Sequence, residues 1–208
     1  MRPLETKTIK EKKRQRINII IGIIIAILMI ASVIGYALLE NYQNQNEEQT
    51  IKYKNYKFIK TESGWQTQIK VLEQSTILNT YYLPQELENI SIQGTPLLAD
   101  FLNKAIFIVA TTNTEQQAAL EYNVFNKIAL RMQLACSPEQ ENSTFCLENN
   151  LPIKSCEDAD WQNTIIIIKE TENETSIEYK NSCLIIRGKG IELIKANEKA
   201  IFTIFGII

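Results

Sequence analysis

The longest uninterrupted apolar stretch of the chain is residues 17–39, with the sequence INIIIGIIIAILMIASVIGYALL. Its 23 residues carry no charge, and Asn18 is the one strongly polar side chain among them. A helix rises about 1.5 Å per residue, so the stretch would span about 34 Å, enough to cross a bilayer core of about 30 Å. The pattern predicts a transmembrane helix over residues 17–39.

The charges on either side of this stretch predict its orientation. Residues 1–16 contain seven Lys or Arg and two Glu, a net charge of +5, whereas the rest of the chain has 15 basic and 22 acidic residues, a net charge of −7. Lys and Arg accumulate on the cytoplasmic side of a span. We therefore expect a basic cytoplasmic tail, a single span in the cell membrane (type II) and a C-terminal domain outside. The acidic domain argues against nucleic-acid binding.

Two other interpretations of residues 17–39 stay open. A buried core helix is disfavoured, because such a helix rarely shows about 20 uncharged residues on all of its faces. A cleaved signal peptide could use Gly35-Tyr36-Ala37 as a small-x-small site, although the apolar stretch is longer than the usual region of about 7–15 residues. The spaced pairs Gly22 with Ala26 and Ala31 with Gly35 would also suit close helix packing in a membrane complex.

Residues 40–50 are polar and aperiodic, which is typical of a linker, and residues 51–208 then form one extracytoplasmic domain. Residues 51–82 are rich in aromatic and β-branched side chains. Glu62-Ser63-Gly64 predicts a hairpin turn between two strands, and Thr76–Tyr82 a third strand. Pro84–Ile90 predicts a short helix, with proline in its first turn.

The middle of the domain predicts a βαβ unit. Ala105–Thr111 and Thr164–Ile168 are apolar runs of the kind found in strands buried on both faces. Between them, Thr114 and Gln117 fit a capping box at the start of a helix. The apolar stripe of this helix is Ala118, Tyr122, Phe125, Ala129 and Met132. The two strands are expected to be parallel.

The C-terminal part adds two strands and a helix. Thr175–Tyr179 and Ser182–Arg187 are expected to join the same sheet as antiparallel strands. Residues 191–205 show helical periodicity, and Gly206 with Ile207 fits a glycine C-cap. The fold class is therefore α/β (α+β): an N-terminal transmembrane helix, then a mixed-sheet domain with a βαβ unit and a C-terminal helix.

Composition excludes several kinds of chemistry. The chain has no histidine, which removes Ser-His-Asp and Cys-His nucleophile systems, HExxH sites and histidine-ligated metals. It also has no CxxC motif, so neither a zinc ribbon nor a thioredoxin-type redox pair is supported. The sequence assigns no catalytic, cofactor-binding or metal-binding residue.

The chain has four cysteines, Cys136, Cys146, Cys156 and Cys183. An even number in an exterior domain indicates disulfide bonds, and four cysteines allow three pairings. We favour Cys136–Cys146, which would order a polar loop, and Cys156–Cys183, which would tie the entry of one strand to another strand of the sheet. Buried free thiols stay open, and a four-thiolate zinc site is disfavoured by the spacing.

Several polar groups are weaker candidates for chemistry. Oxygen ligands in Glu157-Asp158-Ala159-Asp160 with Asn163 would suit Ca²⁺, but the spacing of a calcium loop is missing, so a solvated loop is favoured. Gly188-Lys189-Gly190 would suit an anion or simply a turn. Glu115 with Glu121 and Glu172 with Glu174 are carboxylate pairs that would suit general acid–base catalysis. Three aromatic residues would form either a binding surface or ordinary packing: Trp65, Tyr81 and Tyr82. N-glycosylation sequons occur at Asn89, Asn142 and Asn173.

Four segments carry a resemblance to a known group: YKFIKTESGW, YLPQELENI, SCEDADWQNTIIIIKETENETSIEYKNSCLIIRG and ANEKAIFTIFGI. Together they resemble, over most of residues 53–208, a group of uncharacterised single-pass membrane proteins of archaea. The resemblance is strongest in the C-terminal third. It implies a cytoplasmic tail, one span and one exterior α/β domain, and it implies no catalytic residues.

These observations favour a membrane-anchored binding or assembly module of the cell envelope. Its expected partners are the lipid bilayer, through residues 17–39, and another envelope protein. Two alternatives stay open: an envelope enzyme that uses carboxylate or thiol chemistry, and a subunit of a larger membrane complex.

Overall fold

The structure is a computed structural model that describes residues 20, 24–25, 27–31, 49–71, 74–111, 114–172 and 174–208 of the chain. The chain divides into two compact units, Met1–Glu48 and Gln49–Ile208. In the first unit the described residues are helical. The described part of the chain contains no helix whose length and hydrophobicity would carry it across a membrane. Most of the span predicted over residues 17–39 lies outside the described residues.

The second unit begins with a four-stranded antiparallel sheet in the order β1-β2-β3-β4. Its strands are β1 (Thr50–Tyr53), β2 (Tyr56–Thr61), β3 (Gly64–Val71) and β4 (Gln74–Thr80). The predicted hairpin is confirmed, because β2 and β3 pair across the turn at residues 62–63. Along β3 the side chains of Trp65, Thr67, Ile69 and Val71 are buried, which is the period of two expected for a sheet with one covered face.

A second, mixed sheet has six strands in the order β5-β9-β10-β8-β6-β7. Its strands are β5 (Ile92–Gln93), β6 (Ala105–Ala110), β7 (Arg131–Ala135), β8 (Asn163–Glu170), β9 (Ser176–Lys180) and β10 (Cys183–Gly188). The four strands β10, β8, β6 and β7 run parallel, and β9 is antiparallel to β10. The two apolar runs predicted to be parallel neighbours are β6 and β8, and Ile108 lies opposite Ile166.

Two details of this sheet differ from the sequence prediction. The helix after β6 leads first to β7, a strand not predicted from the sequence, so the βαβ unit is β6–α2–β7. The strand β10 is parallel to β8 rather than antiparallel, because β9 lies outside β10 in the strand order. A strand that returns past its neighbour in this way leaves no local sequence signal.

The helices of this unit are α2 (Glu115–Phe125), α3 (Thr144–Glu148) and α4 (Ile191–Ile204). Short 3₁₀ turns occur at Pro84–Leu87, Leu98–Asp100, Pro138–Gln140 and Cys156–Asp158. The predicted C-terminal helix is confirmed as α4, and the predicted cap is present. Gly206 has φ +66° and its N–H bonds to the Thr203 carbonyl, while the N–H of the buried Ile207 bonds to the Phe202 carbonyl.

The prediction for α2 was wrong in two respects. The Thr114 side chain does not cap the helix but donates to the Thr111 carbonyl, at 2.8 Å between the oxygens. The helix also ends at Phe125, so Ala129 and Met132 of the predicted stripe lie beyond it, and Met132 belongs to β7. The apolar spacing ran on by coincidence into a strand.

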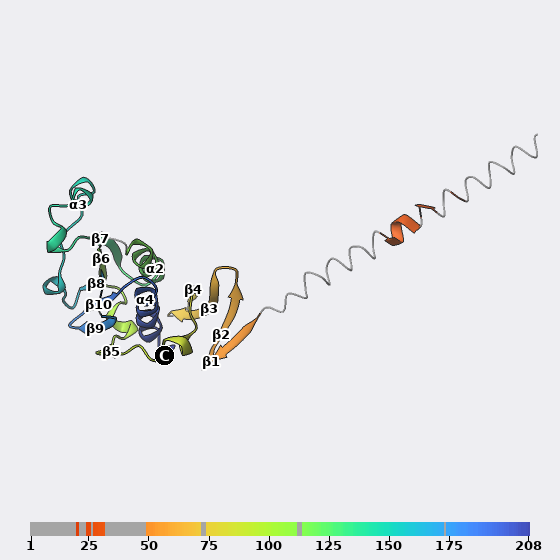
Figure 1. The fold of residues 1–208 in the computed structure, drawn as a ribbon, viewed down its shortest axis with the longest axis horizontal. Coiled ribbons are helices and arrows are strands. Elements are labelled where there is room, and N and C mark those ends of the chain that lie inside the picture. The colour runs from red at the N-terminus through yellow and green to blue at the C-terminus, as the bar shows by residue number, and fades with distance from the viewer. Residues whose placement is uncertain are drawn as a thin grey trace, which may run out of the picture. The chain divides into compact units, whose positions relative to one another are not determined.

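The main core lies between the two sheets, α2 and α4 (Figure 1). Even-numbered residues of the central strands, such as Ile106, Ile108 and Ile166, face this core, and Phe58 of β2 packs edge-on against Phe202 of α4 with ring centroids 5.9 Å apart. The opposite face of the second sheet holds a smaller cluster that includes Phe107 and Ile165. Both faces are therefore covered, as the continuous apolar sequences of β6 and β8 require.

Candidate binding sites on the two sides of helix α2

A cavity of about 590 Å³ lies beside α2, at the carboxyl end of β6. We call it the groove, and it is lined by Ala110, Thr111, Glu115, Ala118, Ala119, Tyr122, Asn123, Leu134, Ala135, Gln140, Ser143 and Phe145. In open α/β sheets, ligands bind preferentially outside the carboxyl ends of the strands. The groove therefore occupies the usual position of a binding site in this kind of fold.

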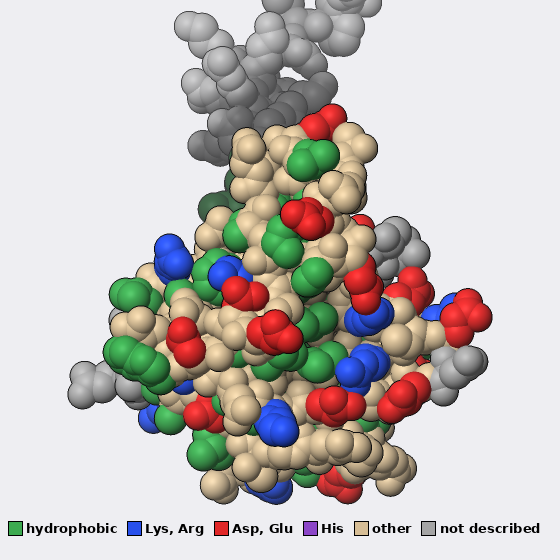
Figure 2. All heavy atoms as spheres, turned by 90° about the vertical axis from the view of Figure 1, so that its left-hand side faces the viewer, with side chains coloured by type: hydrophobic (Ala, Val, Ile, Leu, Met, Phe, Trp, Pro, Cys, Tyr) green, Lys and Arg blue, Asp and Glu red, His purple; other side chains and the backbone are tan. Residues whose placement is uncertain are grey.

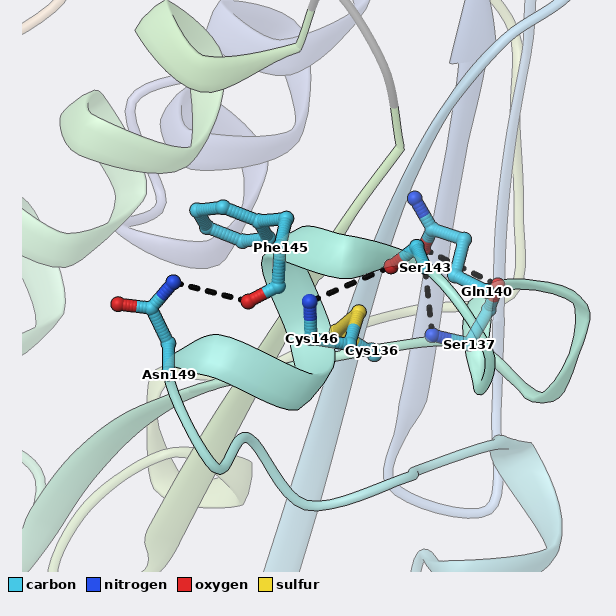
Figure 3. The surroundings of a disulfide bond; sticks show 7 residues. All are labelled: Cys136, Ser137, Gln140, Ser143, Phe145, Cys146 and Asn149. Atoms are coloured by element: carbon cyan, nitrogen blue, oxygen red, sulfur yellow. Dashed lines mark hydrogen bonds between the residues drawn. A yellow bond between two sulfur atoms is a disulfide. The ribbon is translucent and has the colours of Figure 1, made fainter.

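The groove exists because small side chains meet at its floor. Ala110 ends β6, Ala135 ends β7, and Ala118 and Ala119 face them from α2. On the other wall Phe145 of α3 is 61% exposed, although a phenylalanine would normally be buried. In Figure 3 the ring of Phe145 projects from α3 toward the side on which α2 lies.

The wall with Phe145 is held in place by covalent and hydrogen bonds. The disulfide bond Cys136–Cys146 ties α3 to the end of β7, and the Ser143 hydroxyl accepts a hydrogen bond from the Cys146 N–H at 3.3 Å (Figure 3). The Asn149 side-chain amide donates to the Phe145 carbonyl at 2.8 Å. These bonds order a segment too short to bury a core of its own.

The surroundings of the groove are acidic. Residues 136–150 contain Glu139, Glu141 and Glu148, and α2 presents the exposed Glu115, while neither residues 136–150 nor α2 has a Lys or Arg. Figure 2 shows acidic and hydrophobic side chains, without basic ones, on the upper part of the face that it presents, the end at which α3 lies in Figure 1. One base from outside these segments, Lys169, pairs with Glu139 at 3.2 Å.

A second cavity, of about 320 Å³, lies between α2, α4 and the ends of β3 and β4. We call it the pocket, and it is lined by Ser63, Trp65, Asn79, Thr80, Tyr81, Gln116, Gln117, Ala119, Leu120, Asn123, Ile194 and Asn197. Ala119 and Asn123 line both cavities, so the groove and the pocket flank the same helix.

Two buried amides of the pocket lack hydrogen-bond partners among the residues that the structure describes. Gln117 is 7% exposed and its Oε1 has no partner, while Asn197 is fully buried and neither its Oδ1 nor its Nδ2 has one. Most buried polar side chains in proteins are hydrogen-bonded, because leaving one unpaired is costly. These two amides are therefore unusual among the described polar groups that line a cavity.

Two carboxyl groups are also buried. Burial raises the pKa of Glu121 on α2 well above its ordinary value, and neither of its oxygens has a partner among the described residues. Burial also raises the pKa of Glu198 on α4 to about 7, and the N–H groups of Tyr81 and Tyr82, which donate to this carboxylate, oppose the shift. Glu198 thus serves as a hydrogen-bond acceptor for backbone N–H groups. Glu121 lines neither the groove nor the pocket.

The acidic loop predicted as a calcium candidate uses its carboxylates internally. Asp158 accepts the Ser155 N–H at 2.8 Å and pairs with Lys154 at 3.0 Å, and Asp160 accepts the N–H groups of Gln162 and Asn163, both at 2.7 Å. These bonds lower the pKa of both aspartates. No group of metal-binding side chains is found among the described residues.

The structure does not bring the other predicted polar candidates together. Glu115 is exposed at the groove, whereas Glu121 is buried, since positions six apart lie on different faces of a helix. Glu172 pairs instead with Lys189 of the Gly-Lys-Gly turn, at 2.8 Å, and Glu174 is exposed.

The other candidates have mixed outcomes. Trp65 is 7% exposed, and Lys60 Nζ lies 4.7 Å from the centroid of its ring. Tyr81 is 59% exposed. Trp65 and Tyr81 line the pocket, whereas Tyr82 does not. The sequon residues Asn89 and Asn142 are exposed, and Asn173 lies outside the described residues. The disulfide bonds are Cys136–Cys146 and Cys156–Cys183, the two pairs that the sequence favours.

Sequence reasoning missed the residues that define both cavities. Leu134 and Phe145 lie in two five-residue segments, RMQLA and TFCLE, whose patterns give no indication of a groove. Asn197, in contrast, could have been noticed in the sequence. It interrupts the apolar stripe of α4 between Ala196 and Ala200, where the helix is buried, so a polar side chain at this position must be buried too. Gln117 was assigned to a cap although it lies on the buried face of α2 with Ala118 and Glu121.

Comparison with known proteins adds no functional information: no family model, curated protein or solved structure matches the chain. The resemblance to archaeal membrane proteins therefore stays a sequence-based prediction.

Proposed function

We propose that this protein is a membrane-anchored, extracytoplasmic binding module that holds an apolar, basic segment of another envelope protein in the groove. The observation that carries the proposal is the groove itself. Its volume of about 590 Å³, its largely apolar walls and its position at the carboxyl end of β6 are the features of a preformed ligand site.

Two observations support an anchored, exterior location. The disulfide bonds Cys136–Cys146 and Cys156–Cys183 are stable only in an oxidising compartment. In the first unit the described apolar side chains between Ile20 and Ile30 are 52–68% exposed on a helix. The uncharged, apolar sequence of residues 17–39 is suited to lipid, and the basic residues before it favour a cytoplasmic N-terminus.

The chemistry of the partner follows from the walls and the rim. Phe145, Leu134 and Tyr122 offer apolar surface that is 61%, 38% and 40% exposed. Among the described residues, Glu115 is the one charged side chain that lines the groove, and segment 136–150, which supplies Gln140, Ser143 and Phe145 to its wall, contains three Glu and no Lys or Arg. An apolar side chain flanked by Lys or Arg satisfies both features, because it removes apolar surface from water and pairs with the acids.

The same residues favour binding over the enzymatic alternative. Of the described residues that line the groove and the pocket, Glu115 is the one carboxylate, so neither cavity pairs two carboxylates. All four cysteines are in disulfide bonds, which leaves no thiol for nucleophilic chemistry.

Site-specific photo-crosslinking in cells that express the full chain tests the proposal. A photoreactive side chain at Leu134 in the groove should give a discrete protein adduct, and the same group at Leu147, which is 61% exposed on α3 but outside the groove, should not. The adduct peptide should contain an apolar residue beside Lys or Arg. Glu115→Lys should lower the adduct yield at position 134 about fivefold, the effect of about 1 kcal/mol in affinity.

Three results would contradict this function. The first is equal labelling at positions 134 and 147. The second is an adduct at position 134 whose yield does not respond to Glu115→Lys. The third is labelling at position 134 of lipid or of a small molecule in place of a protein.

A further inference from the structure

We propose that the pocket between α2, α4 and the ends of β3 and β4 binds an uncharged, polyhydroxylated ligand of one or two sugar rings. Its volume of about 320 Å³ suits a ligand of that size. This site lies on the other side of α2 from the groove, so the inference goes beyond the function proposed above and does not depend on it.

The first observation is the absence of charge. None of the described residues that line the pocket is Asp, Glu, Lys or Arg, although 22% of the chain is charged. Its polar side chains are amides and hydroxyls, among them Asn79, Gln117 and Asn197. Anions and cations would find no opposite charge here, whereas a neutral ligand with hydroxyl groups matches groups that both donate and accept.

The second observation is that buried hydrogen-bonding capacity is left unused. The fully buried amide of Asn197 offers one donor group and one acceptor without partners among the described residues, and Gln117 offers a further acceptor at its Oε1. Along the helix, position 197 is flanked by the buried apolar residues Leu193, Ala196 and Ala200. An amide kept at such a position is explained by a ligand that completes its hydrogen bonds.

The third observation is the aromatic side of the pocket. Tyr81 is 59% exposed, and Trp65 lines the same cavity in a buried position. The C–H groups on the face of a sugar ring carry a small positive partial charge, and they pack against the electron-rich face of an aromatic ring. The combination of amides with an exposed aromatic ring separates a sugar from smaller neutral ligands such as urea.

A bound water is the competing explanation, since buried waters also satisfy unpaired polar groups. Substitution of the amide by an apolar side chain of similar shape distinguishes the two. If a ligand is the partner, Asn197→Leu removes an unpaired group from the ligand-free protein, so its melting temperature should hold or rise while sugar binding is lost. If a permanent water is the partner, Asn197→Leu should lower the melting temperature.

The experiment uses the oxidised full chain in a detergent without a sugar headgroup. Glucose, galactose, mannose, N-acetylglucosamine and their disaccharides are titrated calorimetrically, and a panel of immobilised polysaccharides and glycopeptides forms a second arm. At least one neutral sugar should bind saturably with one site per chain. Binding in the first arm alone indicates a free sugar, and tighter binding in the second indicates a glycan of the envelope.

The variants are Asn197→Leu and Gln117→Met, and the matched control is Gln133→Met on the exposed strand β7, outside both cavities. Both pocket variants should bind the sugar about tenfold more weakly or worse, as expected when hydrogen bonds to a buried site are lost. The control should bind as the parent chain does. Leu134→Glu in the groove should also leave sugar binding unchanged, so failure here is separable from failure of the proposed function.

Several results would overturn the inference. One is that no neutral sugar in either arm gives a saturable isotherm. Another is that a sugar binds equally well to the parent chain and to Gln117→Met. If Asn197→Leu unfolds or loses thermal stability, the amide is structural and the inference fails even where Gln117→Met weakens binding.

Discussion

Glu198 on α4 accepts a hydrogen bond from the backbone N–H of Tyr81, with 2.6 Å between Oε1 and the nitrogen, across 117 residues of sequence. Its second oxygen accepts the N–H of Tyr82 at 3.0 Å. The chain leaves the first sheet at these two residues, where strand pairing has ended. One buried carboxylate thus replaces the missing strand partner and ties the first sheet to the C-terminal helix.

The first prediction is that Glu198→Leu lowers the free energy of unfolding by about 2–4 kcal/mol, because it leaves two partly buried N–H groups without their acceptor. The control is Glu192→Leu, which removes an exposed ion pair with Lys195 and should cost less than about 1 kcal/mol. Urea unfolding of the oxidised fragment 45–208 measures both, since the apolar segments of this unit find their partners within it. Equal costs for the two variants would show that the carboxylate does not support the backbone.

The second prediction concerns pH. Burial raises the pKa of Glu198 to about 7 in the folded protein, against 4.5 for an ordinary glutamate. The folded state therefore holds this proton more tightly than the unfolded state, and the contribution is fully present below pH 4.5 and is lost as the pH rises to about 7. The total loss is about 3 kcal/mol at most. Glu198→Gln should flatten the stability profile in this window, and an unchanged slope would contradict the assignment.

The third prediction is that Glu121→Met stabilises the protein at pH 7 by about 1–3 kcal/mol, because it replaces a buried carboxyl that has no hydrogen-bond partner among the described residues by an apolar side chain of similar length. The raised pKa of Glu121 has the same sign as that of Glu198, so its removal should also reduce the loss of stability as the pH rises above 4.5. The exposed Glu115→Met is the control, with a change within about 0.5 kcal/mol. Destabilisation by Glu121→Met would reveal a partner for its oxygens.

The fourth prediction separates the two disulfide bonds. Replacing Cys156 and Cys183 by alanine opens a loop of 27 residues and should cost about 3–4 kcal/mol, while replacing Cys136 and Cys146 opens a loop of 10 and should cost about 2–3 kcal/mol. Binding in the groove should be weakened more by the loss of Cys136–Cys146 than by the loss of Cys156–Cys183, because the shorter loop positions Phe145. Denaturant unfolding and crosslinking at Leu134 measure the two effects, and loss of crosslinking in both double variants alike would contradict this division.

The fifth prediction is the membrane topology. A reagent that cannot cross the membrane should not label Lys7 or Lys10 in intact cells, whereas an added protease should remove the C-terminal domain, because the basic tail favours the cytoplasmic side. Mass spectrometry of the recovered chain locates both modifications. Labelling of Lys7 from outside would reverse the orientation.

The sequence alone determined the features that depend on local patterns. The apolar runs of β6 and β8 predicted two central strands, because a strand covered on both faces has no polar positions. Gly206 predicted the end of α4, since only its φ of +66° allows the Schellman bonds there. Loop lengths and the expected sheet neighbours favoured the cysteine pairs that the structure shows.

The tertiary structure alone decided the rest, because it depends on contacts between distant segments. The strand β7 reads RMQLA, in which Met132 and Leu134 alternate with two polar residues, but the run is short and mostly exposed as an edge strand, so its place beside β6 could not be read from it. The pocket joins Tyr81, Gln117 and Asn197, which are far apart along the chain. Whether an amide is satisfied, or a phenylalanine is left exposed at a groove, depends on what the whole fold places next to it, and residue type does not encode that.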